Sequence, residues 1–420
     1  MTNQHVSLIE LIQQNVSNSK ELEKLYQSQP QQFKSAFLSN LNDLPNVPLI
    51  EFWKERLNFT AEKKVLFPKD ILIVLLILIG ISGIIAKLPI WLSLAPEFYF
   101  QRNIGLILFP AATAFFLYKN KSSNTSIAAF SLILILIAVF INLLPANQQS
   151  QTLMIACMYL PFLLWSISGV AAAGNSINKR ENWISYLQMN GDWIVMSAIL
   201  SITGGIITGI TVGLFELIQV KLEIILSQHI LYWALPAIPI TALILVNQFP
   251  NLINRVAPTI ANIFSPLVLV VLIAYLTTLL LTGKNPYNNR DFLILFNVML
   301  IGVMALILFA SGNKHESTSK FIHFNLTALS WVAIAINLIA VSAIVFRIVQ
   351  WGFTPNRVTV LGSNILILIH LIWVSLALTK QIKGKKNTTA IHDAIALFIP
   401  AYMVWAAINI FIFPFLFGGK

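Results

Sequence analysis

The residues with the clearest chemical potential lie in a short turn, QWGFTPNRVTV, at positions 350–360. Gly352 can end a helix with a positive φ, and Thr354 followed by proline is a favourable start for the next helix. Arg357 falls at the third position of that helix, where the positive end of the helix dipole disfavours a cation. Arg347 lies ten residues earlier, and we expect the two arginines to form one cluster.

Such a cluster needs a negative partner, because a cation at a helix start is otherwise unfavourable. A lipid phosphate is one candidate, since arginine binds phosphate through two parallel hydrogen bonds. A carboxylate is the other, and the acidic residues expected on the same side of the protein are Glu97, Glu216, Glu223 and Asp291. The turn therefore predicts a charge cluster of Arg347, Thr354 and Arg357 with Glu216, Asp291 or an anionic lipid headgroup.

Other polar side chains interrupt long apolar runs, notably His370, Asn364 and Asn337. A polar group inside a membrane needs a partner or a cavity. A satisfied hydrogen bond between helices is a simpler explanation of His370 than a proton relay. The sequence has no nucleophile, phosphate-loop or zinc-protease motif, and its six histidines are scattered. We therefore expect no enzyme activity, no metal and no cofactor.

A stripe of small residues occupies one face of the stretch 193–217, with members every four positions: Ser197, Ser201, Gly205, Gly209 and Gly213. Small residues let the backbone of another helix approach closely, which favours helix association in lipid. Tight packing on another span of the same chain is the first interpretation. A homo-oligomer seam and a sliding surface of a transporter are the alternatives.

The composition indicates that most of this chain lies in a lipid bilayer. Of its 420 residues, 57% are hydrophobic and only 10% charged, with a mean hydropathy of +0.77. Soluble domains carry about 25% charged residues. The single cysteine, Cys157, lies in an apolar run and is expected to be a small buried hydrophobe. The net charge of +11 needs no nucleic-acid partner, because basic residues collect in the cytoplasmic loops of membrane proteins.

The apolar runs predict an all-α, polytopic membrane protein with about eleven spans of roughly 20 residues. The shortest predicted span is the second, 104–118. Of the basic residues in the loops and at the ends of the spans, sixteen then fall on the side of the N-terminus and seven on the other side. This bias predicts a cytoplasmic N-terminus and an external C-terminus. The predicted spans are 71–94, 104–118, 127–144, 153–174, 193–217, 229–246, 260–281, 292–310, 325–349, 358–379 and 394–413.

The N-terminal segment, residues 1–66, differs from the membrane part, residues 67–420. It alternates charged and apolar residues at helical spacing and predicts a small helical cytosolic segment. Its last amphipathic stretch, VPLIEFWKERL at 47–57, has two equal interpretations. It lies on the membrane surface, or it packs on the other helices of the segment.

The run RIVQWGFTPNRVTVLG, residues 347–362, resembles the signature of a family of uncharacterised bacterial multi-pass membrane proteins. In that family a G-x-T-P-N-R turn joins two late membrane helices. The family is a domain of unknown function. The resemblance implies a bacterial inner-membrane location and transfers neither an activity nor any catalytic residue.

Two functions agree with these features. The first is a permease-like or channel-like transporter of an unknown solute, suggested by the number of spans, the small-residue stripe and the prolines at 236, 239, 258 and 266. The second is a non-transporting scaffold or sensor whose N-terminal segment binds a cytosolic partner. A polar cavity at mid-membrane depth would favour transport, whereas a solid core with polar groups at its rims would favour the scaffold.

Overall fold

The computed structural model of the protein describes residues 8–45, 47–58, 68–145, 149–176, 179–217, 222, 225–249, 256–282, 287, 290–311, 320–382 and 388–419. The chain separates into two compact units, Met1–Lys69 and Asp70–Lys420. Every regular element among the described residues is a helix, so the predicted all-α class is confirmed.

The described residues of the first unit form four α-helices and one 3₁₀ turn. They are α1 (Leu8–Gln14), α2 (Ser19–Ser28), α3 (Pro30–Ser39), η1 (Leu41–Asp43) and α4 (Pro48–Asn58). Asn18 caps α2 by accepting a 3.3 Å hydrogen bond from the backbone N–H of Glu21. Proline occupies the first position of α3, where its missing N–H costs nothing.

The core of the first unit decides the position of the stretch 47–57. Its buried members are Ile12, Leu22, Phe33, Phe37, Leu44, Ile50, Trp53 and Leu57, so α4 packs on the other three helices. Arg56 of α4 stacks on Tyr26 and Trp53 and pairs with Glu23 at 2.6 Å. This hydrogen bond from Arg56 lowers the pKa of the Glu23 carboxyl. The second of the two interpretations is therefore the observed one.

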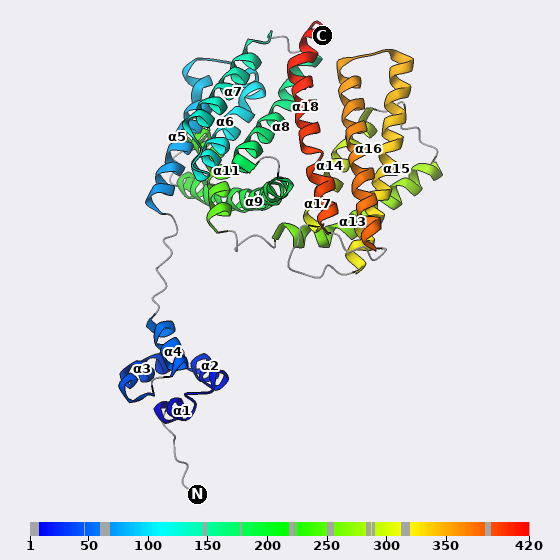
Figure 1. Cartoon of the computed structure of the whole chain (residues 1–420). Helices are drawn as coiled ribbons and strands as arrows, with labels where there is room; N and C mark the ends of the chain where they lie inside the picture. The colour runs from blue at the N-terminus through cyan, green and yellow to red at the C-terminus, as the bar shows by residue number, and fades with distance from the viewer. Residues whose placement is uncertain are drawn as a thin grey trace. The chain divides into compact units, whose positions relative to one another are not determined.

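The second unit is a bundle of long apolar helices (Figure 1). Among its described residues, ten helical stretches are long and apolar enough to cross a membrane, and the apolar part of α14 is shorter, Phe296–Ala310. Each of the eleven predicted spans lies largely in helix. The elements are α5 (Lys69–Trp91), α6 (Pro96–Lys119), α7 (Asn124–Leu143), α8 (Gln151–Ala173), η2 (Gly174–Ser176), α9 (Arg180–Leu217), η3 (Leu226–Ile230), α11 (Leu231–Gln248), α13 (Val256–Thr282), α14 (Arg290–Ser311), α15 (Lys320–Trp351), α16 (Pro355–Ile382), α17 (Thr388–Ala396), α18 (Ile399–Ala407), η4 (Ile408–Ile412) and α19 (Phe413–Leu416).

Two of these helices differ in direction from the rest. In Figure 1, α9 and α13 run across the view, whereas α8, α15, α16 and α18 run mostly along its vertical. With 38 residues, α9 is about 57 Å long, well beyond the hydrocarbon thickness of about 30 Å. An upright crossing would therefore leave much of α9 outside the bilayer. The helix is also far longer than the predicted span 193–217, because it begins at Arg180.

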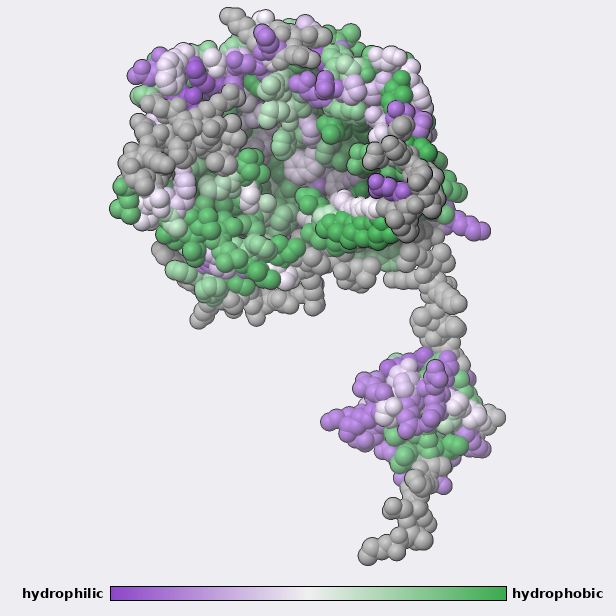
Figure 2. Space-filling view, turned by 180° about the vertical axis from the view of Figure 1, so that it is seen from behind, coloured by the Kyte–Doolittle hydropathy of each residue, from purple (hydrophilic) through white to green (hydrophobic). Residues whose placement is uncertain are grey.

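Among the described residues of the second unit, two buried clusters each join several helices. One cluster contains residues of the five helices from α13 through α17 and of the first half of α9. The other joins α6, α7 and α8 with α18 and η4. Figure 2 shows the outside of the same unit. Hydrophobic side chains cover the middle of the visible face, and hydrophilic ones gather at its upper end. An apolar exterior of this extent is what a bilayer requires.

Candidate functional site

The turn between α15 and α16 is built as its sequence predicts. Gly352 has a φ of 77° and ends α15 with a 2.8 Å hydrogen bond from its N–H to the Ile348 carbonyl. Thr354 caps α16, because its Oγ1 accepts the N–H of Arg357 at 3.4 Å. Pro355 is the first residue of α16. The reversal therefore needs only these local groups.

Backbone carbonyls of the neighbouring helix compensate the positive charge of Arg357 at the start of α16. Its Nη1 donates to the carbonyls of Trp351 and Gly352, both at 2.7 Å. These carbonyls lie at the C-terminal end of α15, which carries negative partial charge. Arg347 and Arg357 also lie over the Trp351 ring, at 5.5 and 5.8 Å from its centroid. The two arginines thus do form one cluster, around an indole.

The predicted acidic members of this cluster are not seen with it. In the described part of the chain no carboxylate lies within ion-pair distance of Arg357. Glu216 is exposed near the end of α9. Asp291 belongs to α14, but its side chain lies outside the described residues, as does Glu223. The lipid phosphate stays a prediction.

The two asparagines of α15 and α16 face each other. The Nδ2 of Asn337 donates to the backbone carbonyl of Asn364 at 3.2 Å, and the Nδ2 of Asn364 donates to Val360 within its own helix. Both residues are fully buried, and each leaves its Oδ1 without a donor. The pair therefore joins the two helices as expected, with two amide oxygens still unpartnered.

His370 belongs to α16 and faces the start of α18. Its Nδ1 is 3.1 Å from the hydroxyl of Tyr402, and its ring stacks on Phe398 with centroids 4.5 Å apart. The residue is 4% exposed, and its Nε2 has no hydrogen-bond partner. This is the hydrogen bond between helices that the sequence favours over a proton relay.

Among the described residues, the middle of the small-residue stripe has no packing partner, which contradicts the first interpretation of it. A Cβ built on Gly205 or Gly209 would meet no atom within 4 Å, and Ser201 is exposed. Among the described residues of α9, none beyond position 193 is buried. The physical reason is that α9 outruns the bundle, whose contacts bury only its first half, including Trp183 and Trp193. Ser197 lies at the edge of the stripe, and the surroundings of Gly213 are outside the described residues.

Asp192 is the most informative residue that the sequence interpretation missed. It is 6% exposed, and its Oδ1 has no hydrogen-bond donor. Its neighbours on α9 tie the helix to three others. Asn190 accepts from Trp165 of α8 at 3.1 Å, Trp193 donates to the Pro239 carbonyl of α11 at 2.7 Å, and the bare Gly191 lies against Phe309 of α14.

The signal for Asp192 was present. Its helix was predicted to begin at position 193, which left the carboxylate in a loop. Hydropathy does not identify the polar run RENWISYLQMNGDW as part of a membrane helix. The run can nevertheless be buried, because its Asn, Tyr and Trp side chains are hydrogen-bonded to neighbouring helices. A charged residue inside a membrane helix is by default a candidate for function.

Arg102 is a second buried ion, with a structural role. It is 1% exposed and caps the C-terminal end of α7, donating to the carbonyls of Ile141, Leu144 and Pro145 at 2.7 to 3.2 Å. Beside it, Asn103 and Asn142 exchange two hydrogen bonds of 3.0 and 2.8 Å. These residues make the second span longer than predicted, since α6 begins at Pro96.

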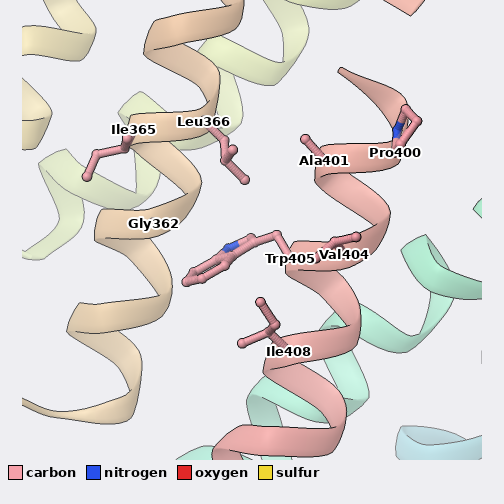
Figure 3. A pocket seen from close by; sticks show the side chains of 8 residues that line it. All are labelled: Gly362, Ile365, Leu366, Pro400, Ala401, Val404, Trp405 and Ile408. Carbon is pink, nitrogen blue, oxygen red and sulfur yellow. The ribbon is translucent and has the colours of Figure 1, made fainter. Parts of the chain in front are cut away.

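Two pockets stand out among the described residues. One is an apolar groove of about 530 Å³ between α16 and α18 (Figure 3). The other, of about 320 Å³, is polar and lies at helix ends, around the turn from α6 to α7 and the end of α8. Neither is a polar cavity between spans.

Comparisons with known proteins give no relative. No family model matches the chain, and no curated protein or solved structure matches it either. The resemblance of residues 347–362 to an uncharacterised bacterial family stays a prediction.

Proposed function

We propose that this integral membrane protein is a permease-like transporter whose ion or solute path passes Asp192. The supporting observation is the burial of this carboxylate with an unpartnered oxygen. A charge taken out of water is costly unless it is paired, so such a group is kept where it meets a proton, a cation or a substrate.

The helix that packs beside Asp192 has the irregular backbone that such a path uses. Pro236 and Pro239 lie inside α11, so the carbonyls four residues earlier lose their usual N–H partners. A π-helical turn, η3, precedes α11 directly. Interrupted helices beside an intramembrane carboxylate are the arrangement that supplies ion ligands in many transporters.

Transport can be measured without knowing the solute. Proteoliposomes of the full chain on a solid-supported membrane are switched rapidly to pools of amino acids, sugars, nucleosides, carboxylates or inorganic phosphate. We expect a current with at least one pool, which Asp192→Asn abolishes. Asp393→Asn is the matched control, because Asp393 forms an exposed ion pair with Arg180 at 3.5 Å.

Two results would contradict this assignment. Equal currents from the wild type and Asp192→Asn would remove Asp192 from the path. Silence with every pool would favour the second candidate, a non-transporting scaffold or sensor. That candidate is supported by the first unit, which has a core of its own and could bind a cytosolic partner. It is also supported by the pockets of the described residues, neither of which is a polar cavity between spans.

We further propose a bacterial inner-membrane location with a cytoplasmic N-terminus. The support is the bias of basic residues described above. Single cysteines at Ser122 and Gln148, which precede and follow α7 in the sequence, should react with an impermeant maleimide from inside and outside, respectively. Labelling of both from one side would overturn this topology.

A further inference from the structure

The apolar groove between α16 and α18 is a built feature of the fold. Its lining carries no polar side-chain atom except the indole N–H of Trp405, which donates to Ser363 Oγ at 3.0 Å. Figure 3 shows its walls, with α16 on one side and α18 and η4 on the other. The lining residues are Gly362, Ile365, Leu366, Pro400, Ala401, Val404, Trp405 and Ile408.

The groove owes its depth to small residues beside a fixed indole. A Cβ on Gly362 would collide with the Trp405 ring, so the indole lies directly against the bare backbone of α16. Ser363, which accepts the Trp405 N–H, also forms a 2.6 Å hydrogen bond with Tyr159 of α8. Phe413 packs edge-on against the same indole at 6.0 Å. The floor is therefore held from three sides, before any ligand arrives.

The mouth of the groove lies on the surface of two candidate membrane spans. Its rim residues Ile365 and Val404 are 40% and 59% exposed, and both walls belong to candidate membrane spans. Water has no reason to fill the space, because a buried water needs two to four polar partners and the lining offers none. An empty groove would lose dispersion contacts on every wall.

We propose that the groove binds one acyl chain of a membrane phospholipid. The groove runs along Pro400–Ile408, eight residues of rise or about 12 Å of helix, so it holds a part of that chain. A lipid tail gains no hydrophobic free energy when it moves from the bilayer into an apolar groove. Its preference for the groove over the bilayer therefore comes from van der Waals packing on several sides. The groove recognises the chain and contributes no contact to the headgroup, which makes binding indifferent to headgroup charge.

Native mass spectrometry of the detergent-purified chain tests this directly. The probes are dioleoyl phosphatidylcholine, dioleoyl phosphatidylglycerol and a single-chain lysophosphatidylcholine. We expect one retained lipid for each probe with similar affinity. Ala401→Phe fills the groove and should lower affinity roughly tenfold, as the loss of about ten carbon–carbon contacts implies. Ala274→Phe, on an exposed face of α13, is the matched control and should change nothing.

A second measurement avoids the risk that Ala401→Phe disturbs folding. Phospholipids brominated along the acyl chain quench tryptophans in contact with them, and the difference between wild type and Trp405→Phe isolates the share of Trp405. We expect Trp405 to be quenched in the wild type. Absence of that share, or equal lipid retention by Ala401→Phe and the wild type, would overturn the proposal. A preference for phosphatidylglycerol would also overturn it, in favour of a headgroup site elsewhere.

Discussion

Replacement of Arg357 tests whether its role is to cap the preceding helix. The guanidinium makes two 2.7 Å hydrogen bonds to the last carbonyls of α15. A hydrogen bond to a charged group contributes about 1.5–3 kcal/mol. A cation at an exposed helix C-terminus adds about 0.3–1 kcal/mol. Both donations are exposed, so we expect Arg357→Gln to cost about 1–2 kcal/mol.

That loss should appear as a lower melting temperature in detergent. For a large domain, about 2–4 °C is expected per kcal/mol, so Arg357→Gln should melt about 2–8 °C below the wild type. Arg357→Lys keeps the charge but not the fork of donors, and we expect it to recover about half of the loss. The control is Arg180→Gln, which breaks only the exposed 3.5 Å pair with Asp393 and should cost less than about 1 kcal/mol.

Added anionic lipid separates the two explanations of Arg357. If backbone carbonyls are its partner, the difference between wild type and Arg357→Gln is the same with and without phosphatidylglycerol. A difference that exists only with anionic lipid would refute the capping argument and restore the predicted phosphate partner. Identical melting of all variants in both conditions would show Arg357 to be a solvated surface residue.

Three further outcomes follow from the geometry. Gly209→Leu should change the stability of the monomer by no more than about 0.5 kcal/mol, read by its melting temperature, because open space surrounds this position among the described residues. Loss of an oligomer on size-exclusion chromatography would instead reveal a seam between copies. Arg102→Ala should destabilise the fold by about 3 kcal/mol or more, read by yield and melting, because three carbonyls lose a charged donor; a normal melt would refute its role as a cap. The pKa of Glu23 is lower in the folded protein than its ordinary value of 4.5. The stability that Glu23 contributes is therefore fully present above pH 4.5 and is lost as the pH falls through the folded pKa. Hydrogen exchange of α2 and α4 should rise in that acidic range in the wild type but not in Arg56→Ala.

The long apolar runs made the helices predictable, because a bilayer leaves the backbone few alternatives to helix. The turn at Gly352 and Thr354 was equally readable, since it depends only on local groups. Hydropathy failed where a helix begins in polar residues. Asp192 and Arg102 were therefore assigned to loops, although tertiary hydrogen bonds bury the runs that carry them.

Features that depend on the partner of a helix face could not be predicted from one chain. The stripe through Gly205 and Gly209 has the pattern of a close helix pair, yet the pattern does not say whether a second helix is present. The stretch 47–57 had one amphipathic pattern and two apolar environments that would satisfy it. Only the burial of Trp53 distinguishes them.

The cluster that joins α6, α7 and α8 has a consequence for biosynthesis. Among its buried members are Ala406 and Ile410, which are translated well after α8 is complete. Ribosomes add about 5–20 residues per second, so α8 waits on the order of 10–50 s for them. During that interval the face of α8 that receives α18 and η4 is covered only by lipid or by an insertion factor. A chain that stops before residue 400 would keep that face open, which gives membrane quality control a feature by which to distinguish copies that lack α18 from copies that contain it.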